Sequence, residues 1–331
     1  MQDKIAVIGG GSWGTALANL VAANGYDVCI YVKEDEVVES INLKNENSIF
    51  MPGIKLHENV KSQKLDKITQ EHISAAIWAV PTQFCRSVAE FGRNALKNAK
   101  ILIATKGIEI ETGELIYDIL QEEFDSGLLS ILSGPSFAKE VAKKKPTAVS
   151  IASKNEVERN LWQKIVSTDY FRAYTTNDVI GVEVGGAIKN VVAIATGISD
   201  GLGFGLNARA GLITRGLAEI TRLGVALKAH KETFMGLSGM GDLVLTSTGE
   251  LSRNRNVGLK LAKGLSLNEI LDSMNMVAEG VFTAKAAYNL ARKMKVEMPI
   301  TDEVYKILYQ NKSPKDSVMD LMSRDLKDER I

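Results

Sequence analysis

The chain has 331 residues, of which 45% are hydrophobic, and its 40 basic and 40 acidic side chains give a formal net charge of zero at pH 7. A chain of this length is expected to form two domains. The balanced charge excludes the broad positive field that nucleic acids and acidic membranes require, so an anionic ligand would be bound by a local cluster of side chains.

The first predicted elements are an apolar strand at Lys4–Ile8, a glycine-rich turn and a helix. The turn reads Gly9-Gly10-Gly11-Ser12-Trp13-Gly14, and G-x-G-x-x-G between a strand and a helix indicates a dinucleotide site. Gly9 would allow the tight turn, Gly11 would let the backbone approach a pyrophosphate, and Gly14 would let the helix pack on the strand. The alternative is a glycine turn that binds nothing, but the strand and helix around it favour a nucleotide.

The second strand, Asp27–Val32, is expected to select the nucleotide. In NAD-selective sites of this type an acidic residue at the end of this strand binds the adenosine ribose. Here Lys33 follows the strand, and a cation would accept a 2′-phosphate, which favours NADPH over NADH. In the alternative interpretation Glu34 or Asp35 fills the acidic role and Lys33 points to water.

The rest of the first half alternates strands and helices, and this order predicts a mostly parallel, doubly wound sheet. Its further strands are predicted at Ala75–Val80, Ile101–Thr105, Leu128–Leu132 and Thr147–Ala152. Near Thr176 the pattern changes to long apolar helices, predicted at Val179–Ile198, Ala208–Leu223, Leu259–Lys263, Leu267–Met274, Ala278–Lys293 and Ile300–Gln310. We therefore predict an α/β Rossmann-type domain over residues 1–177 and an all-α domain over 178–331.

The first of these helices places Lys189 among apolar residues on nearly every side. A desolvated ammonium has a lowered pKa and could act as a general acid near neutral pH. The alternative is a lysine whose stem lies along apolar surface while its charge reaches water. Gly185 and Gly186 lie one turn before it and are unfavourable inside a helix, so another segment should approach that face closely.

Two later clusters favour the chemical interpretation of Lys189. Asp242 follows a glycine turn, and the run Ser252-Arg253-Asn254-Arg255-Asn256 places two guanidinium groups among amides and a hydroxyl, as a phosphate seat would. In the first half, Thr105-Lys106-Gly107 and Ser133-Gly134-Pro135-Ser136 each follow a predicted strand, where ligands bind in open α/β sheets.

Taken in order, these motifs resemble the NAD(P)-dependent glycerol-3-phosphate dehydrogenase family in its bacterial biosynthetic branch. The resemblance extends through nearly the whole chain and rests on these segments: Gly9–Thr15, Ala104–Gly107, Ser133–Ser136, Gly185–Asn190, Ser199–Gly203, Asn207–Arg209, Thr214–Gly216, Gly239–Asp242 and Ser252–Arg255. The sequence departs from the family pattern at a few places. Lys33 stands where relatives often carry Arg or His. Ser247, Glu250 and Leu251 differ from the pattern in the loop before Ser252.

The resemblance implies reversible reduction of dihydroxyacetone phosphate to sn-glycerol 3-phosphate for phospholipid synthesis. It makes Lys189 the proton donor, with Lys106 and Asp242 as the other catalytic residues. It implies substrate binding by Lys106, Gly134, Ser136, Lys189, Asn190, Asp242, Ser252, Arg253 and Asn254. It implies NADPH or NADH binding by Gly9, Gly11, Ser12, Trp13, Gly14, Lys33, Lys106, Ala138, Arg253, Val277 and Glu279.

The sequence also bears on the location and the assembly of the protein. The start of the chain lacks a basic and an apolar targeting region, and no run of eighteen apolar residues follows, so we expect a cytoplasmic protein without a membrane partner. Cys29 and Cys85 lie in apolar stretches without metal or redox spacing, and no metal site is expected. The family resemblance also implies a homodimer.

Two rival functions remain open at this point. A β-hydroxyacid or 6-phosphogluconate type of dehydrogenase would also combine a nucleotide domain, a helical domain and a lysine. A regulator that senses NADPH without chemistry would keep the fold but would not need Lys106, Lys189 and Asp242 together. A short-chain dehydrogenase is disfavoured because the sequence has no Tyr-x-x-x-Lys.

Overall fold

The computed structural model describes residues 4–274, 276–326 and 328–329. The chain divides into two compact units, one of residues 1–105 and 116–179 and one of residues 106–115 and 180–331. The predicted domains are the continuous stretches 1–177 and 178–331. The compact units differ from them in the segment 106–115 and in a boundary that lies two residues later. Ile108 and Leu115 are buried in an apolar cluster of the second unit, which is why this segment belongs to it.

The first unit is built on one eight-stranded sheet with the order β3-β2-β1-β4-β5-β6-β7-β8. All neighbouring strands run parallel except the antiparallel pair β6 and β7. The strands are β1 (Ile5–Ile8), β2 (Val28–Val32), β3 (Val60–Lys64), β4 (Ala75–Trp78), β5 (Lys100–Ile103), β6 (Leu129–Ser133), β7 (Thr147–Ala152) and β8 (Phe171–Thr176). The predicted, mostly parallel sheet is confirmed.

Strands β3 and β8 were not predicted, and both lie at the edges of the sheet. In β3 only Val60 and Ser62 are buried, and in β8 only Phe171 and Ala173 are. An edge strand has a neighbour on one side only, so it can carry polar residues that hide the strand pattern in the sequence.

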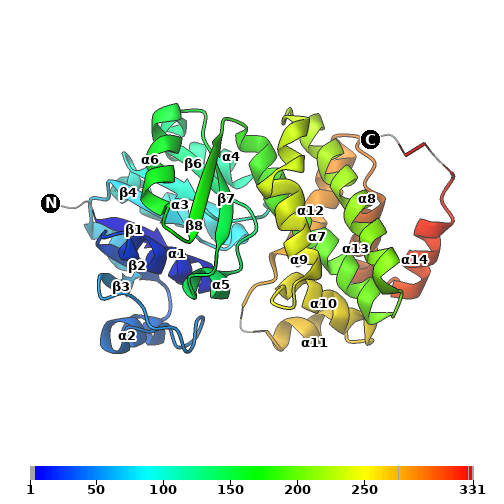
Figure 1. The fold of residues 1–331 in the computed structure, drawn as a ribbon, viewed down its shortest axis with the longest axis horizontal. Coiled ribbons are helices and arrows are strands. Elements are labelled where there is room, and N and C mark those ends of the chain that lie inside the picture. The colour runs from blue at the N-terminus through cyan, green and yellow to red at the C-terminus, as the bar shows by residue number, and fades with distance from the viewer. Residues whose placement is uncertain (1–3, 275, 327, 330–331) are drawn as a thin grey trace. The chain divides into compact units, whose positions relative to one another are not determined.

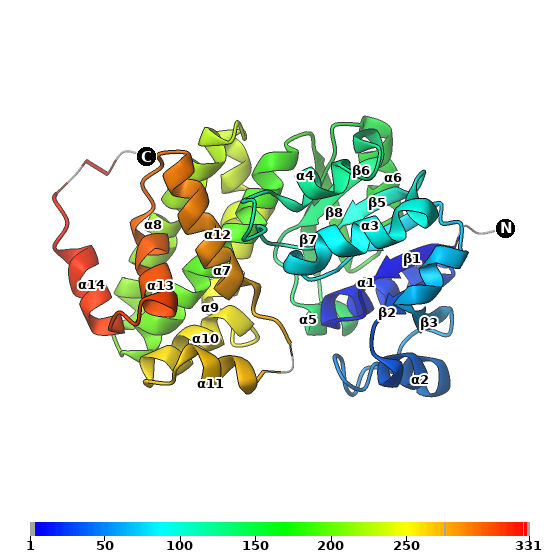
Figure 2. The same ribbon diagram turned by 180° about the vertical axis from the view of Figure 1, so that it is seen from behind.

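Helices cover both faces of the sheet, as the doubly wound prediction requires. Figures 1 and 2 show α1 and α6 on one face and α3 and α4 on the other. The helices of this unit are α1 (Ser12–Ala23), α2 (Asp35–Lys44), α3 (Cys85–Leu96), α4 (Ile116–Gln121), α5 (Ala138–Ala142) and α6 (Glu156–Val166). Cys29 and Cys85, which form no disulfide in the described part of the chain, are both buried in this unit.

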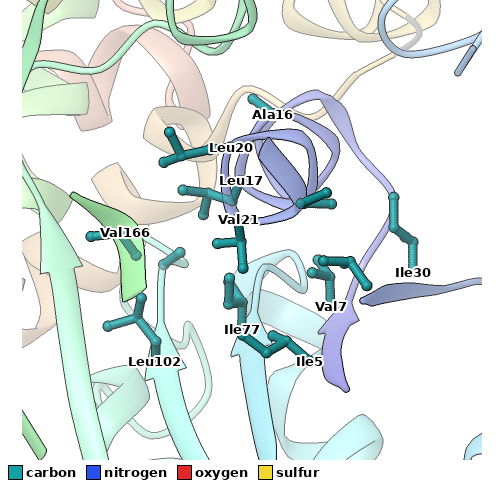
Figure 3. Packing of buried hydrophobic residues seen from close by; sticks show 14 of the residues in the cluster. Ile5, Val7, Ala16, Leu17, Leu20, Val21, Ile30, Ile77, Leu102 and Val166 are labelled. Atoms are coloured by element: carbon teal, nitrogen blue, oxygen red, sulfur yellow. The ribbon is translucent and has the colours of Figure 1, made fainter. Parts of the chain in front are cut away.

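The core of the first unit fixes the glycine turn at one end of the sheet. Leu17 and Val21 of α1 lie above Val7 and Ile77 of the central strands, and all four side chains are fully buried (Figure 3). Burying side chains of this size stabilises the folded state by about 1.5–3 kcal/mol each. The packing therefore holds the start of α1 directly beyond the end of β1.

The second unit is helical, as predicted. Its helices are α7 (Val179–Gly201), α8 (Gly205–Ala226), α9 (Asp242–Thr248), α10 (Arg253–Ala262), α11 (Leu267–Asp272), α12 (Glu279–Lys293), α13 (Pro299–Tyr309) and α14 (Pro314–Met322), with a π-helical turn η5 at Leu237–Gly241 (Figure 1). Helix α7 is long and apolar enough to cross a membrane, but 94% of its most apolar window is buried inside the protein. It is the central core helix of this unit, between two apolar clusters.

Candidate functional site

The glycine turn of the first unit has the geometry expected of a dinucleotide cradle. Gly9 has φ +107°, and a Cβ there would lie 2.5 Å from the carbonyl oxygen of Ala79. A Cβ on Gly14 would collide with the carbonyl oxygen of Gly9, so helix and strand approach as closely as the sequence predicted. A Cβ on Gly11 would meet nothing within 4 Å, so this backbone is open to a ligand.

The start of α1 provides donors for an anion. Gly11 is the N-cap residue and has no side chain to accept a hydrogen bond from the first turn. The first N–H groups of a helix have no partner inside the helix and favour negative charge. The backbone N–H groups of Ser12 and Trp13 could therefore donate to a pyrophosphate. Trp13 donates from its indole nitrogen to the carbonyl of Ala104 at 3.2 Å, which ties it to the end of β5.

The other candidate cofactor and substrate residues of this unit follow the ends of parallel strands. Lys33 is exposed and comes directly after β2, while Gly134 and Ser136 come one and three residues after the end of β6. Ser136 donates its hydroxyl to the carbonyl of Gly134 at 2.9 Å, and Ala138 begins α5. Since β1, β2, β4, β5 and β6 run parallel, these residues share one edge of the sheet, where ligands of such folds bind.

A lysine–aspartate cluster is buried in the second unit. Lys189 lies on α7, and its side chain is only 8% exposed. Its Nζ donates to Oδ1 of Asp242 and, at 3.0 Å, to the hydroxyl of Thr246. Lys106 donates to Oδ2 of the same aspartate at 2.8 Å, and that carboxylate is 1% exposed. The alternative of a lysine reaching water is therefore wrong for Lys189.

The electrostatics of this cluster set two opposite pKa shifts. Burial lowers the pKa of Lys189 from 10.5 to about 7, although Asp242 raises it, and the second ammonium, Lys106, lowers it further. Burial alone would raise the pKa of Asp242, but Lys106 and Lys189 outweigh it and hold that pKa below its ordinary value. Lys189 can therefore gain and lose a proton near neutral pH, while the carboxylate stays charged.

The glycine pair before Lys189 has the close neighbour that the sequence predicted. A Cβ on Gly185 would lie 2.6 Å from the carbonyl oxygen of Ser238, in the η5 turn. That turn runs directly into α9, whose first residue is Asp242. The missing side chain thus lets the turn pack on α7 and brings the aspartate to the lysine.

The start of α10 forms a polar cradle in the same unit. Ser252 caps the helix by accepting from the backbone of Arg255 at 3.2 Å. Asn254 donates to the side chain of Asn190 at 2.8 Å and accepts from the backbone of Gly280 at 3.0 Å. Because Asn190 is next to Lys189 on α7, these bonds tie the cradle to the lysine cluster.

The two arginines of α10 differ in their surroundings. Arg253 is exposed and donates to the carbonyl of Val277 at 2.8 Å, two residues before Glu279 begins α12. Arg255 instead pairs with Asp200, with 2.6 Å between Nη2 and Oδ2. The prediction of two guanidinium groups in a phosphate seat is therefore wrong for Arg255, because an acidic partner 55 residues away in sequence occupies it.

Comparison with known proteins identifies the family. Family models described as the N-terminus and C-terminus of NAD-dependent glycerol-3-phosphate dehydrogenase match residues 4–158 and 178–319. The chain belongs to this family. It is 52% identical to the glycerol-3-phosphate dehydrogenase (NAD(P)+) of Citrifermentans bemidjiense over 100% of both chains. It is 53% identical to that of Solidesulfovibrio magneticus, over 98% of this chain and 100% of the relative.

A solved structure of the family has the same fold. The crystal structure of glycerol-3-phosphate dehydrogenase from Coxiella burnetii matches 98% of this chain and 99% of its own, with a TM-score of 0.92 at 36% identity. The α/β and all-α architecture predicted from the sequence is therefore that of this glycerol-3-phosphate dehydrogenase.

Two supporting residues of this family member were not predicted. Thr246 contacts Lys189 and, at 3.3 Å, Asp242, and its spacing of one helical turn from Asp242 could have revealed it. Asn47 is fully buried and donates to the carbonyl of Gly10 and the hydroxyl of Thr15, both at 2.8 Å. No local pattern could have identified Asn47, since its partners lie more than 30 residues away in sequence.

Proposed function

We propose that this chain reduces dihydroxyacetone phosphate to sn-glycerol 3-phosphate with NADPH or NADH, reversibly, to supply glycerophospholipid synthesis. The observation that carries the proposal is the buried Lys189–Asp242–Lys106 cluster in a chain of this family. Burying charged groups costs free energy even when they are paired. A regulator without chemistry would have no use for two ammonium groups around one buried carboxylate.

The first unit would bind the dinucleotide. The open backbone at Gly11 and the donors at Ser12 and Trp13 fit a pyrophosphate, Lys33 fits a phosphate on the ribose, and Gly14 and Gly9 form the turn that presents them. Family resemblance adds Ala138, Val277, Glu279, Lys106 and Arg253 to this list. The reduced nicotinamide ring supplies the hydride when the cofactor is bound.

Lys189 would supply the proton. As the carbonyl carbon accepts a hydride, the oxygen gains negative charge and takes a proton from Nζ, which leaves a secondary alcohol and a neutral amine. A pKa of about 7 suits this transfer in both directions. Asp242 holds the ammonium in place, and Lys106, the other cation on that carboxylate, would stabilise the developing alkoxide.

The substrate phosphate would be bound by Arg253, with Ser252, Asn254 and Asn190 beside it. Arg253 has the planar fork that binds phosphate oxygens at two points, and its neighbours are fixed by their own hydrogen bonds. By family resemblance, Gly134 and Ser136 would also contact the substrate.

The experiment that tests this function follows absorbance of the reduced cofactor with purified protein and dihydroxyacetone phosphate, with NADPH and NADH in separate runs. Oxidation of the cofactor that depends on this ketone supports the proposal. Faster reduction of a β-keto acid, or reduction of the oxidised cofactor by a six-carbon sugar acid phosphate, would favour the rival dehydrogenases. Nucleotide binding without turnover of any ketone would favour the regulator.

Replacing the exposed arginine of the cradle should weaken substrate binding more than the chemical step. For Arg253→Ala we expect the KM for dihydroxyacetone phosphate to rise about tenfold or more, since a hydrogen bond to a charged group contributes about 1.5–3 kcal/mol. Arg253→Lys keeps the charge without the fork and should lie between wild type and Arg253→Ala. An unaltered KM in steady-state kinetics would remove Arg253 from the phosphate seat.

The cofactor preference should depend on the lysine after β2. For Lys33→Glu we expect the ratio of kcat/KM with NADPH to kcat/KM with NADH to fall about tenfold or more, because a carboxylate would repel the 2′-phosphate. The measurement compares both cofactors in wild type and variant. An unchanged ratio would favour the interpretation in which Glu34 or Asp35 binds the ribose.

Location and assembly belong to the same proposal. We expect a cytoplasmic homodimer that acts on a small phosphorylated substrate, in line with the family resemblance. Light scattering of the purified chain would give the mass of the assembly, and a monomeric mass would contradict the homodimer.

A further inference from the structure

A second lysine lies beside Lys33 at the end of β2. Strands β2 and β3 pair in parallel, and their register sets Lys64 opposite Val32, the residue before Lys33. The Lys64 ammonium donates to the backbone carbonyl of Lys33 at 2.6 Å and pairs with Asp35 at 3.0 Å. These contacts aim Lys64 toward the end of β2.

The end of β2 carries more acidic than basic side chains. Residues 33–36 read Lys-Glu-Asp-Glu and are exposed, so this segment alone carries one cation and three carboxylates. Such a segment would repel a phosphate, and its carboxylates would suit the hydroxyls of an unphosphorylated ribose. Lys64 adds a second cation and engages the Asp35 carboxylate, which shifts the local balance toward an anion.

We propose that Lys64 determines cofactor specificity by letting the end of β2 accept the 2′-phosphate of NADPH beside Lys33. The inference rests on the proposed function, since it assigns a further residue to the same nucleotide site. It predicts that the contribution of Lys64 is specific for ligands with a 2′-phosphate. The side chain is 36% exposed, so replacing it should leave the fold intact.

The test measures ligand binding without turnover. Isothermal titration calorimetry of the full chain would give Kd values for adenosine 2′,5′-bisphosphate and adenosine 5′-monophosphate, which differ only by the 2′-phosphate, and for NADPH and NADH. The variant is Lys64→Gln. The matched control is Lys61→Gln, an exposed lysine three residues earlier on the same strand with the same change of charge. Lys64→Arg keeps the cation.

For Lys64→Gln we expect the Kd values of the bisphosphate and of NADPH to rise about tenfold, while those of the monophosphate and NADH change less than about twofold. Lys61→Gln and Lys64→Arg should stay near wild type. An equal loss for all four ligands, no loss, or the same loss in Lys61→Gln would overturn the inference. If wild type bound neither NADPH nor NADH, the proposed function itself would fail; normal binding with an inert Lys64→Gln would refute this inference alone.

Discussion

Lys189→Ala is expected to lower kcat for reduction of dihydroxyacetone phosphate by about 10²- to 10⁴-fold, the usual contribution of a positioned general acid. The reason is that Lys189 is the buried amine whose pKa lies near 7, held by Asp242 and Thr246. NADPH binding, measured by calorimetry, should persist because the glycine turn that would hold the cofactor does not involve Lys189.

A matched pair of variants separates chemistry from packing. Lys189→Met fills most of the side-chain volume without a charge and should be as inactive as Lys189→Ala, whereas Lys263→Ala removes an exposed lysine of the same unit and should be fully active. Wild-type kcat in either Lys189 variant would refute the assignment of the proton donor.

The same amine predicts a pH dependence with a definite sign. Reduction requires the protonated form, so its rate should fall as pH rises through about 7, whereas alcohol oxidation requires the neutral form and should rise over the same range. Because the folded pKa lies below the unfolded value of 10.5, this group makes the free energy of unfolding increase with pH between about 7 and 10.5. Rates in both directions that do not change across pH 6 to 8 (roughly one unit either side of the pKa) would contradict this assignment.

Asp242→Asn is expected to affect both stability and the pH profile. It removes the negative charge between two ammonium groups. Removing one partner of a buried ion pair lowers the free energy of unfolding by about 3–5 kcal/mol, because the other charge is left buried without a partner. Asp242 is also what raises the pKa of Lys189, so in the variant that pKa should fall below about 7. Reduction near pH 7 should then slow sharply, and its fall should move to lower pH.

Two measurements distinguish positioning from a purely structural role. Chemical denaturation would give the loss in free energy of unfolding, and the pH profile of kcat/KM would give the shift of the apparent pKa. Asp272→Asn, which alters an exposed carboxylate of the same unit, should change neither. If Asp242→Asn lowered the rate equally at every pH, Asp242 would not tune the amine.

The sequence by itself determined the features that depend on local chemistry and short spacing. The G-x-G-x-x-G turn after an apolar strand predicted the nucleotide cradle, because only glycine permits the turn at Gly9 and the close approach at Gly14. A lysine inside an apolar helix after two glycines predicted a close neighbour, and the η5 turn occupies that place. The shift from alternating elements to helices predicted both fold classes.

Tertiary structure decided what depends on partners far away in the sequence. It paired Arg255 with Asp200, placed Asn47 under the glycine turn and brought Lys106 to Asp242 across 136 residues. It also decided that Lys189 stays buried, since the sequence of its own helix was compatible with a lysine that reaches water. The physical reason is that hydrogen bonds, burial and the pKa shifts they cause depend on distances between atoms, and a local pattern fixes such distances only within a few turns of one element.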